Sequence, residues 1–425
     1  MVVVYMLIIM FALFAVGMPI AYAIGIAAVA SMFFFSSIDI SLFATSALTG
    51  MDSFPLMAIP FFVLAGKLME EGGISERLVA LANLIVGKIA GGLAVIATLS
   101  CTIFGAISGS AVATTVAIGG IMLPGMDKAN YPRPFSAAVL CISGIIGALI
   151  PPSLTFVIFG AVTGTSISDL FIAGIIPGLM LAVSLSVTSY FISRKYGYQG
   201  LPANRSFENV WLTLKRSSLA LLVPVIIMGG IYSGIFTPTE AGTVACLYAV
   251  IVALFIYRTL NLKDVYRLTA VSAKLTIVMM VVIAFACGFA RFMAVESVPQ
   301  AISGFLISIT DDKILFLLII NIFLLILGAI MDTTAACIVL APIFVPIAVE
   351  NYGLHPIHFG LIMCFNLLLG LTTPPVGSSV FVTSSFTKIP LQTIGRALVP
   401  FWIGALVCLL LITYVPEISL CLIKK

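Results

Sequence analysis

The sequence predicts an all-α, polytopic membrane protein, and three observations support this fold class. First, the 425 residues are 62% hydrophobic and only 8% charged, with a mean hydropathy of +1.26. Second, the apolar residues form long unbroken runs, such as 219–236 and 397–415, where a soluble helix would carry a single apolar stripe. Third, these runs neither alternate nor stop after about ten residues, which excludes a transmembrane β-barrel.

The chain contains an internal repeat. Its motifs GALIPPS and GLTTPPVG each place a Pro-Pro pair inside an apolar run, beginning at Pro151 and at Pro374. The motifs FGAISGSA and LGAIMDTT lie upstream of these pairs, and the spacing from Gly105 to Gly328 equals the spacing from Pro151 to Pro374. Two independent matches at one offset indicate two halves with the same architecture.

Each half is expected to contain spans, a short amphipathic helix, a hairpin, a helix broken at the Pro-Pro pair and a last span, in that order. The first apolar run lacks the basic start and the cleavage site of a secretory signal, so we expect it to remain as the first span. In the first half (residues 1–200) the elements are predicted at 2–16, 18–35, 54–70, 75–90, 93–125, 135–162 and 168–192. In the second half (residues 219–425) they are predicted at 219–236, 241–256, 275–293, 297–309, 314–349 and 356–386, followed by the final span.

Basic residues predict that the two halves have opposite orientations in the membrane. Cytoplasmic loops collect Lys and Arg, and the loops 193–218 and 257–274 together carry nine of them. With both loops inside, the first hairpin opens toward the cytoplasm and the second toward the outside. Following the predicted spans from these two loops to the end of the chain places Lys424 and Lys425 outside. We attribute this exception to the charge rule to the weak resistance of a short tail to export.

The Pro-Pro pairs predict two unwound points within the membrane. Each proline removes a backbone donor and clashes with the preceding turn, at a cost of about 3 kcal/mol. The freed carbonyls need protein, water or an ion as partners, because hydrocarbon offers none. The hairpins turn at the polar clusters 108–110 (SerGlySer) and 332–334 (AspThrThr), and their arms look too short for two full crossings. We therefore expect re-entrant hairpins whose tips meet the breaks.

Oxygen atoms dominate these tips and breaks. Backbone carbonyls, hydroxyls and one carboxylate suit a hard cation such as Na⁺, so we expect one cation site in each half. Helices that begin after Pro152 and Pro375 would direct their positive ends to the same depth and favour an anionic substrate. Asp332 is the only acidic residue in 314–349. It could cap its helix by accepting from the backbone of Ala335 or support the cation, and the two roles are compatible.

Other polar residues have ordinary structural explanations. Taken singly, Ser and Thr in membrane helices serve packing, although their clustering at matching places in both halves favours a site. We expect His355 and His358 to lie in a loop rather than to bind a metal. Asn366 is expected to bond a neighbouring helix, and Arg291 to pair with Glu296 or extend to the membrane surface. The eight scattered cysteines are expected to be small packing residues.

At GAISGSAVATT, GALIPPS, FTPTEAGTVA and LTTPPVG the sequence resembles the large membrane (M) subunit of the bacterial tripartite ATP-independent periplasmic (TRAP) transporters. The resemblance covers essentially the whole chain. It implies Na⁺-coupled import of an organic acid, of the sialic acid or C4-dicarboxylate class, across the bacterial inner membrane by an elevator movement. It also implies two partners, a periplasmic substrate-binding protein and a small membrane (Q) subunit of about four helices.

Carried onto this chain, the resemblance implies a mobile transport domain of residues 93–165 and 314–390. It would slide against a scaffold of residues 1–92, 166–313 and 391–425. The implied Na⁺ contacts, two or more ions being expected, are Ser108, Gly109 and Ser110 with the break at Pro151, and Thr333, Thr334, Thr372, Thr373 and Gly377. The carboxylate of Asp332 is added to this set from the residue argument above. The candidate substrate contacts are Ser110, Thr114, Ser153, Thr155, Thr334 and Ser378.

Other functions are less consistent with the residues. A stand-alone Na⁺/carboxylate symporter or an ion antiporter of related inverted-repeat architecture remains the alternative. An intramembrane hydrolase would need a Ser-His or paired-Asp arrangement, which the sequence lacks, so we expect no enzyme. No nucleotide-binding motif is present, and the small net charge of +4 gives no reason to expect nucleic acid. Because no Lys or Arg falls in 135–168 or 359–387, a substrate carboxylate would need another segment, the cations, hydroxyls or helix dipoles.

Overall fold

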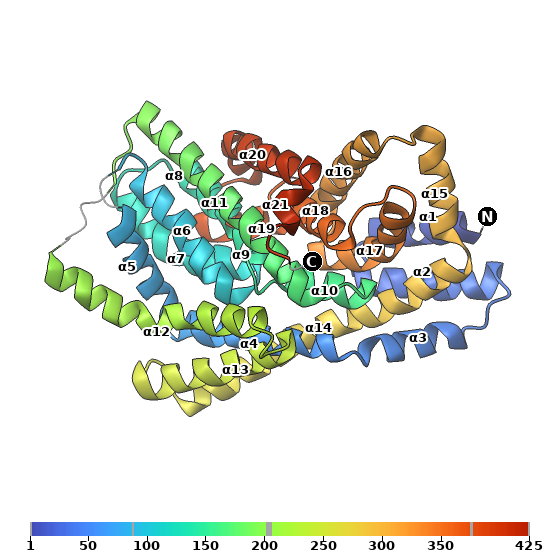
Figure 1. The fold of residues 1–425 in the computed structure, drawn as a ribbon, viewed down its shortest axis with the longest axis horizontal. Coiled ribbons are helices and arrows are strands. Elements are labelled where there is room, and N and C mark those ends of the chain that lie inside the picture. Colours follow the sequence, from blue (N-terminus) through green and yellow to red (C-terminus); the bar gives the residue numbers. More distant parts are fainter. Residues whose placement is uncertain (1, 87–88, 201–205, 375–376, 424–425) are drawn as a thin grey trace.

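The computed structural model describes residues 2–86, 89–200, 206–374 and 377–423, and these residues form helices and short connections (Figure 1). The first half consists of α1 (Val2–Ala15), α2 (Ile20–Phe35), α3 (Ser41–Met51), the 3₁₀ turn η1 (Phe54–Met57), α4 (Ala58–Glu71), α5 (Ile74–Val86), α6 (Gly92–Ser108), α7 (Ala111–Lys128), α8 (Arg133–Gly144), α9 (Ile146–Leu149), α10 (Leu154–Thr163) and α11 (Ile167–Tyr196). The second half consists of α12 (Phe207–Tyr232), α13 (Pro238–Ile251), the π turn η2 (Val252–Ile256), α14 (Leu262–Val295), α15 (Val298–Ile309), α16 (Lys313–Ile330), α17 (Thr333–Glu350), α18 (Pro356–Gly370), α19 (Ser378–Thr387), α20 (Leu391–Tyr414) and α21 (Pro416–Leu420).

The helices confirm a polytopic membrane protein. Within the described ranges, seven helices have the length and apolar composition to cross a bilayer, and nine spans result if each of two bent helix pairs counts as one. One bent pair is α8–α9 with α10, which turns by 43° at the predicted Pro151 break. All eight cysteines are free, and six of them are buried.

Three segments differ from the sequence prediction. Residues Ser41–Met51, which have no counterpart among the predicted spans, form α3 and bend by 57° into η1 and α4. The basic loops are largely helical. Ser206 caps α12, its hydroxyl accepting from the Asn209 N–H at 3.3 Å, and Asn261 forms a capping box with Asp264 at the start of α14. Local capping therefore begins both helices well before the apolar runs.

The hairpin arms are longer than the sequence argument assumes. The helices α16 and α17 have 18 residues each, and α6 and α7 have 17 and 18. At 1.5 Å per residue, an 18-residue helix is about 27 Å long, close to the hydrocarbon thickness of about 30 Å. The re-entrant course and the inverted orientation of the halves stay predictions, and Lys424, Lys425 and Pro375 lie outside the described residues.

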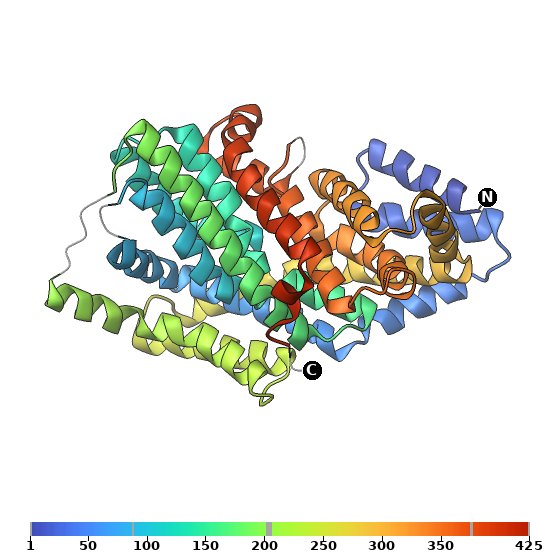
Figure 2. The same cartoon turned by 45° about the horizontal axis from the view of Figure 1, so that its top comes forward.

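The hairpins and broken helices of the two halves interlock. The helix α10, which follows the first break, packs on α17 and α18 of the second half. In the same way α19, which follows the second break, packs on α7 and α8 of the first half. The helices α11 and α20 pack on each other and on this group, α11 through α6 and α20 through α8. Together these helices form the central body of the molecule (Figures 1 and 2).

A second layer of helices lies along one edge of the molecule (Figure 1). The long helix α14 packs on α2, α3 and α4, while α13 packs on α4 and α12 packs on α5 and α13. Many apolar side chains of this layer are exposed, including Leu247, Phe255 and Ile277, which is consistent with contact with lipid or another membrane chain.

Glycine pairs fix the contact between each hairpin and its broken helix. A Cβ atom added at Gly105 would lie 2.4 Å from the Cα of Gly147. One added at Gly370 would lie 2.4 Å from the carbonyl carbon of Gly328. The two pairs have the same internal spacing along the chain, and the repeat offset that relates Pro151 to Pro374 also relates one pair to the other. Both halves therefore use the same crossing, where only a hydrogen atom fits between the backbones.

Candidate functional site

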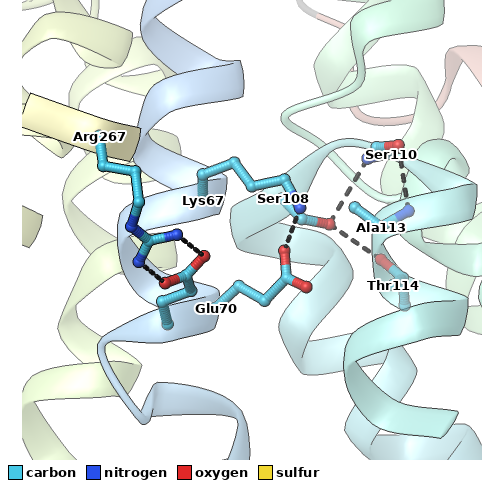
Figure 3. Close-up of polar contacts among 8 residues, drawn as sticks. Lys67, Glu70, Ser108, Ser110, Ala113, Thr114 and Arg267 are labelled. Carbon is cyan, nitrogen blue, oxygen red and sulfur yellow. Dashed lines mark hydrogen bonds and ion pairs between the residues drawn. The ribbon is translucent and has the colours of Figure 1, made fainter. Parts of the chain in front are cut away.

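The first hairpin tip is a compact set of oxygen-bearing groups (Figure 3). The hydroxyl of Ser108 lies 2.8 Å from that of Thr114 and 3.5 Å from the Ser110 N–H, which donates to it. Ser110 caps α7 by accepting from the Ala113 N–H at 3.4 Å. Ser108 and Thr114 are buried, so these hydroxyl groups are held in place by the packed hairpin.

This tip meets the first break, as predicted. The carbonyl oxygen of Gly109 accepts a hydrogen bond from the Leu154 N–H at 3.2 Å. Gly109 has a positive φ of 64°, and a Cβ atom there would lie 2.6 Å from the carbonyl oxygen of Pro152, so a larger residue would separate the tip from the break. Ser153 is buried and caps α10, accepting from the Phe156 N–H at 3.3 Å.

The predicted first-half residues are therefore gathered in one place, around the contact between the tip and the break. The remaining member, Thr155, is buried in the first turn of α10. Several hydroxyls here already have protein partners, since Ser153 also donates to the carbonyl of Ala148. The Ala148 carbonyl is the one that Pro152, four residues on, leaves without a helical donor, so the Ser153 hydroxyl satisfies part of the break from within the protein.

An ion pair that the sequence analysis did not select lies beside the first tip. Lys67 Nζ and Glu70 Oε2 are 2.7 Å apart on α4. A Cβ atom at Gly66 would lie 3.3 Å from the Cα of Ser108, and Figure 3 shows both charged side chains on the side of α4 that faces the tip. The signal available in the sequence was two charges at a spacing of three at the end of the predicted span 54–70.

The second tip carries a charge of its own. Asp332 caps α17, and its carboxylate accepts from the Thr334 N–H at 2.9 Å. The predicted cap is confirmed, but the donor is Thr334 and not Ala335, since the short side chain closes a turn two residues ahead. The hydroxyl of Thr333, which is buried, donates to the carbonyl of Leu367 at 3.3 Å. This bond ties the second tip to the end of α18, one turn before the second break.

The second break is held by a tryptophan. Thr372 is buried, its hydroxyl donates to the carbonyl of Leu369 at 2.8 Å, and it accepts from the indole N–H of Trp402 at 3.0 Å. Thr373 donates to the same Leu369 carbonyl at 3.4 Å, and its own carbonyl accepts from the Gly377 N–H at 3.2 Å. Among the described residues the buried hydroxyl of Ser378 has no hydrogen-bond partner, so it is available to a ligand.

For two other polar residues, the structure confirms one prediction and contradicts the other. Asn366 donates to Asn321 Oδ1 at 2.6 Å, which confirms the expected bond to a neighbouring helix. The loop prediction for His358 is wrong, because it lies in the first turn of α18, buried, with Nδ1 3.1 Å from the hydroxyl of Ser419. His355 caps that helix, so the HisProIleHis segment is a helix start.

A cavity separates the edge layer from the central body near Arg291. It has a volume of about 450 Å³ and lies between α3 and α14 on one side and α10 and α17 on the other. Arg291, Ser46 and Thr49 contribute its polar groups. The expected Arg291–Glu296 pair is wrong: in the described chain Glu296 accepts instead from the hydroxyl of Ser36 at 2.7 Å, and no carboxylate lies within ion-pair distance of Arg291.

The fold defines the class of protein. It is similar to the YdaH transporter of Alcanivorax borkumensis, with a TM-score of 0.65 over 89% of each chain at 13% sequence identity. It is also similar to MtrF of Neisseria gonorrhoeae, with a TM-score of 0.51 over 87% of this chain and 82% of that one, at 15% identity. At these identities the likeness concerns the fold alone, a polytopic helical membrane fold that solved transporters also have.

The sequence then places the chain in a family. Residues 7–418 match the family model described as "Tripartite ATP-independent periplasmic transporter, DctM component". The chain belongs to this family and is therefore the large membrane component of a bacterial TRAP transporter. Its relatives are named as transporter permeases and not as enzymes.

Curated relatives cover nearly the whole chain. The C4-dicarboxylate TRAP transporter large permease protein DctM of Pseudomonas aeruginosa is 45% identical over 91% of this chain and 89% of its own length. The sialic acid TRAP transporter large permease protein SiaM of Vibrio cholerae is 38% identical over 96% and 95%. The 2,3-diketo-L-gulonate TRAP transporter large permease protein YiaN of Escherichia coli is 37% identical over 96% of each chain.

Proposed function

We propose that this protein is the permease subunit of an Na⁺-coupled importer of an organic acid, located in the bacterial inner membrane. The observation that carries the proposal is the pair of oxygen-rich hairpin tips, each bonded to or beside a broken helix in a chain of the DctM family. The relatives' names indicate C4-dicarboxylates, sialic acid and related acids as the substrate class. Because the sequence contains no nucleotide-binding motif, we propose that an ion gradient and not ATP drives the transport.

The residues at the tips fit Na⁺. Na⁺ accepts flexible oxygen coordination. The first half offers the hydroxyls of Ser108 and Ser110, and the second half offers the carboxylate of Asp332 and the unbonded hydroxyl of Ser378. We propose one cation site in each half, at 108–110 with the first break and at 332–334 with 372–377. In both halves the bound ion would be coordinated by backbone carbonyl oxygens near the break.

Arg291 would supply the positive charge for the substrate. It lines the cavity between the edge layer and the central body, without a carboxylate at ion-pair distance among the described residues. A guanidinium group binds a carboxylate through two parallel hydrogen bonds. We therefore propose that the anion meets Arg291 in this cavity before it reaches the hydroxyls of Ser110, Thr334 and Ser378.

The moving part would be the two hairpins with their broken helices. We propose that α6–α10 and α16–α19, which correspond to the ranges 93–165 and 314–390, slide together, because α10 and α19 each pack on the opposite half. The helices α11 and α20 pack on this group, as α5 and α14 also do, and we assign α11 and α20 to the scaffold. The layer of α2–α4 and α12–α14 would also belong to the scaffold, and its exposed apolar faces would contact lipid and the small membrane subunit.

Uptake into proteoliposomes tests this function. The chain is reconstituted with its small subunit, and labelled organic acids are offered with and without a Na⁺ gradient and the periplasmic binding protein. We expect uptake that requires both. Uptake that needs Na⁺ but not the binding protein would favour a stand-alone symporter, and uptake indifferent to Na⁺ would contradict the cation sites.

A further inference from the structure

A polar cavity lies where the two basic segments of the chain meet. Its volume is about 450 Å³, and its wall is formed by α5, the first turns of α12 and the connection between η2 and α14. The hydroxyl of Tyr257 donates to the carbonyl of Arg216 at 3.0 Å, so the segments 193–218 and 257–274, both predicted to be cytoplasmic from their charge, adjoin each other. The cavity is therefore expected at the cytoplasmic surface of the membrane.

Arg77 is held rigidly in the wall of this cavity. Its Nη1 donates to the carbonyl of Gly73 at 2.6 Å, and its guanidinium carbon lies 3.5 Å from the centroid of the Tyr257 ring. The hydroxyl of Ser217 donates to the backbone carbonyl of Arg77 at 3.0 Å. Burial raises the pKa of the Tyr257 phenol, against the opposing effect of Arg77, so this ring stays neutral and keeps its hydrogen bond.

The cavity has an excess of positive charge. Arg77 and Arg216 both line it, against the single carboxylate of Glu76. In the part of the chain that the structure describes, neither guanidinium lies within ion-pair distance of a carboxylate. The hydroxyl of Thr259 already donates to the carbonyl of Gly72 at 2.9 Å. The two guanidinium groups, with the hydroxyl of Thr213 nearby, form a donor set that matches phosphate oxygens.

The surroundings of the cavity favour a lipid as the source of the phosphate. On α12, Trp211 and Leu212 are 63% and 42% exposed, and on η2 Phe255 and Ile256 are 69% and 52% exposed. These side chains come from the same two segments that supply Arg216 and Tyr257. They offer an apolar surface for acyl chains on the segments that also supply the polar cavity. Trp211 lies on the side of α12 away from the cavity-lining residues, and a tryptophan is typical of the interface level.

We propose that this cavity binds the phosphate headgroup of an anionic phospholipid of the cytoplasmic leaflet. Such a lipid would connect α5, α12 and the segment before α14, which already contact one another through Arg77, Ser217 and Tyr257. It would hold this layer at a fixed depth in the membrane. The site is independent of the substrate and cation sites, so its occupancy is measurable without transport.

Native mass spectrometry of the delipidated full chain tests the proposal with phosphatidylglycerol, phosphatidylcholine and inorganic phosphate as probes. We expect saturable binding of phosphatidylglycerol, no comparable binding of phosphatidylcholine, and no competition by millimolar inorganic phosphate. Arg216→Ala should lower the affinity for phosphatidylglycerol about tenfold, the loss of one charge-assisted contact. Arg77→Lys keeps the positive charge but loses the planar guanidinium group that stacks on Tyr257. It should lower the affinity for phosphatidylglycerol less than Arg216→Ala does.

Arg194→Ala is the matched control, since Arg194 is an exposed cation at the end of α11 and does not line the cavity. It should bind phosphatidylglycerol like the wild type. Equal binding of phosphatidylcholine, or an unchanged affinity in Arg216→Ala, would overturn the proposal. Displacement of the lipid by inorganic phosphate would show a free-anion site, and displacement by the small membrane subunit would show a protein interface, and either result would also overturn it.

Discussion

The two hairpin tips occupy the same position in the repeat but differ in charge. The first tip, Ser108–Ser110, has no ionisable side chain of its own, and Glu70 on the adjacent helix α4 is paired with Lys67 at 2.7 Å. The second tip carries Asp332, which has no ion-pair partner among the described residues. Both hairpins nevertheless cross their broken helices through equivalent glycine pairs.

The two halves share their backbone contacts but differ in the polar groups at the tips. The glycine crossing is preserved in both halves because it depends on backbone contact, which tolerates no side chain. The polar groups at the tips differ, with hydroxyls in the first and a carboxylate in the second. We therefore expect the second site, with its unpaired carboxylate, to bind Na⁺ more tightly than the first.

The glycine crossings should be the most sensitive positions. Gly105→Ala and Gly370→Ala would each place a Cβ 2.4 Å from backbone atoms, so the helices must separate and the free energy of unfolding should fall by about 3 kcal/mol or more. Thermal melting and size-exclusion chromatography in detergent measure this loss. Gly120→Ala is the control, because no atom lies within 4 Å of its added Cβ. Wild-type melting of either crossing variant would refute the shared architecture.

The charge at the second tip should have the next largest effect. Asp332→Asn keeps a side chain that can cap α17, whereas Asp332→Ala removes both the cap and the charge. If the carboxylate supports the cation, both variants should raise the Na⁺ concentration for half-maximal uptake by tenfold or more. A role in capping alone predicts a normal Na⁺ dependence for Asp332→Asn and a loss of about 1 kcal/mol of stability for Asp332→Ala.

A substitution of Arg291 tests whether this residue binds the substrate anion. Arg291→Gln should raise the KM for the organic acid about tenfold, with a smaller change in the maximal rate and no change in Na⁺ dependence, because it removes one bidentate contact. Lys263→Gln, at the opposite end of the same helix, serves as the control in the uptake assay. An unchanged KM in Arg291→Gln would exclude this residue from the substrate path.

The smallest effect is expected at the second break. Trp402→Phe removes the indole N–H that donates to Thr372 and should lower the free energy of unfolding by about 1 kcal/mol. The other tryptophan, Trp211, is exposed, so Trp211→Phe should melt like the wild type. Melting curves of the two variants in detergent would then differ by a few degrees, and identical curves would show that the bond does not hold the break.

Several site features were predictable because they depend on local sequence. The Pro-Pro pairs predicted both breaks, and Asp332 was expected as a helix cap from its position before an apolar run. The Lys67–Glu70 pair was missed as a neighbour of the first tip, because its position depends on how α4 packs on α6. Of the two roles expected for Arg291, the pair with Glu296 was wrong for the same reason, since Glu296 bonds to Ser36, which lies far away in the sequence.

The sequence by itself determined the membrane class, the matching motifs in its two halves, most of the helix order apart from α3, and the resemblance to the TRAP family. These properties follow from composition, hydrophobic run length and motif spacing, all of which are written along one chain. Only the tertiary structure decided that α10 and α19 pack on the opposite halves and that Trp402 reaches Thr372. It alone also decided which glycines lie against backbone and which lie in open space. These contacts join residues far apart in the sequence, and no local preference specifies which of the many apolar helix faces meet.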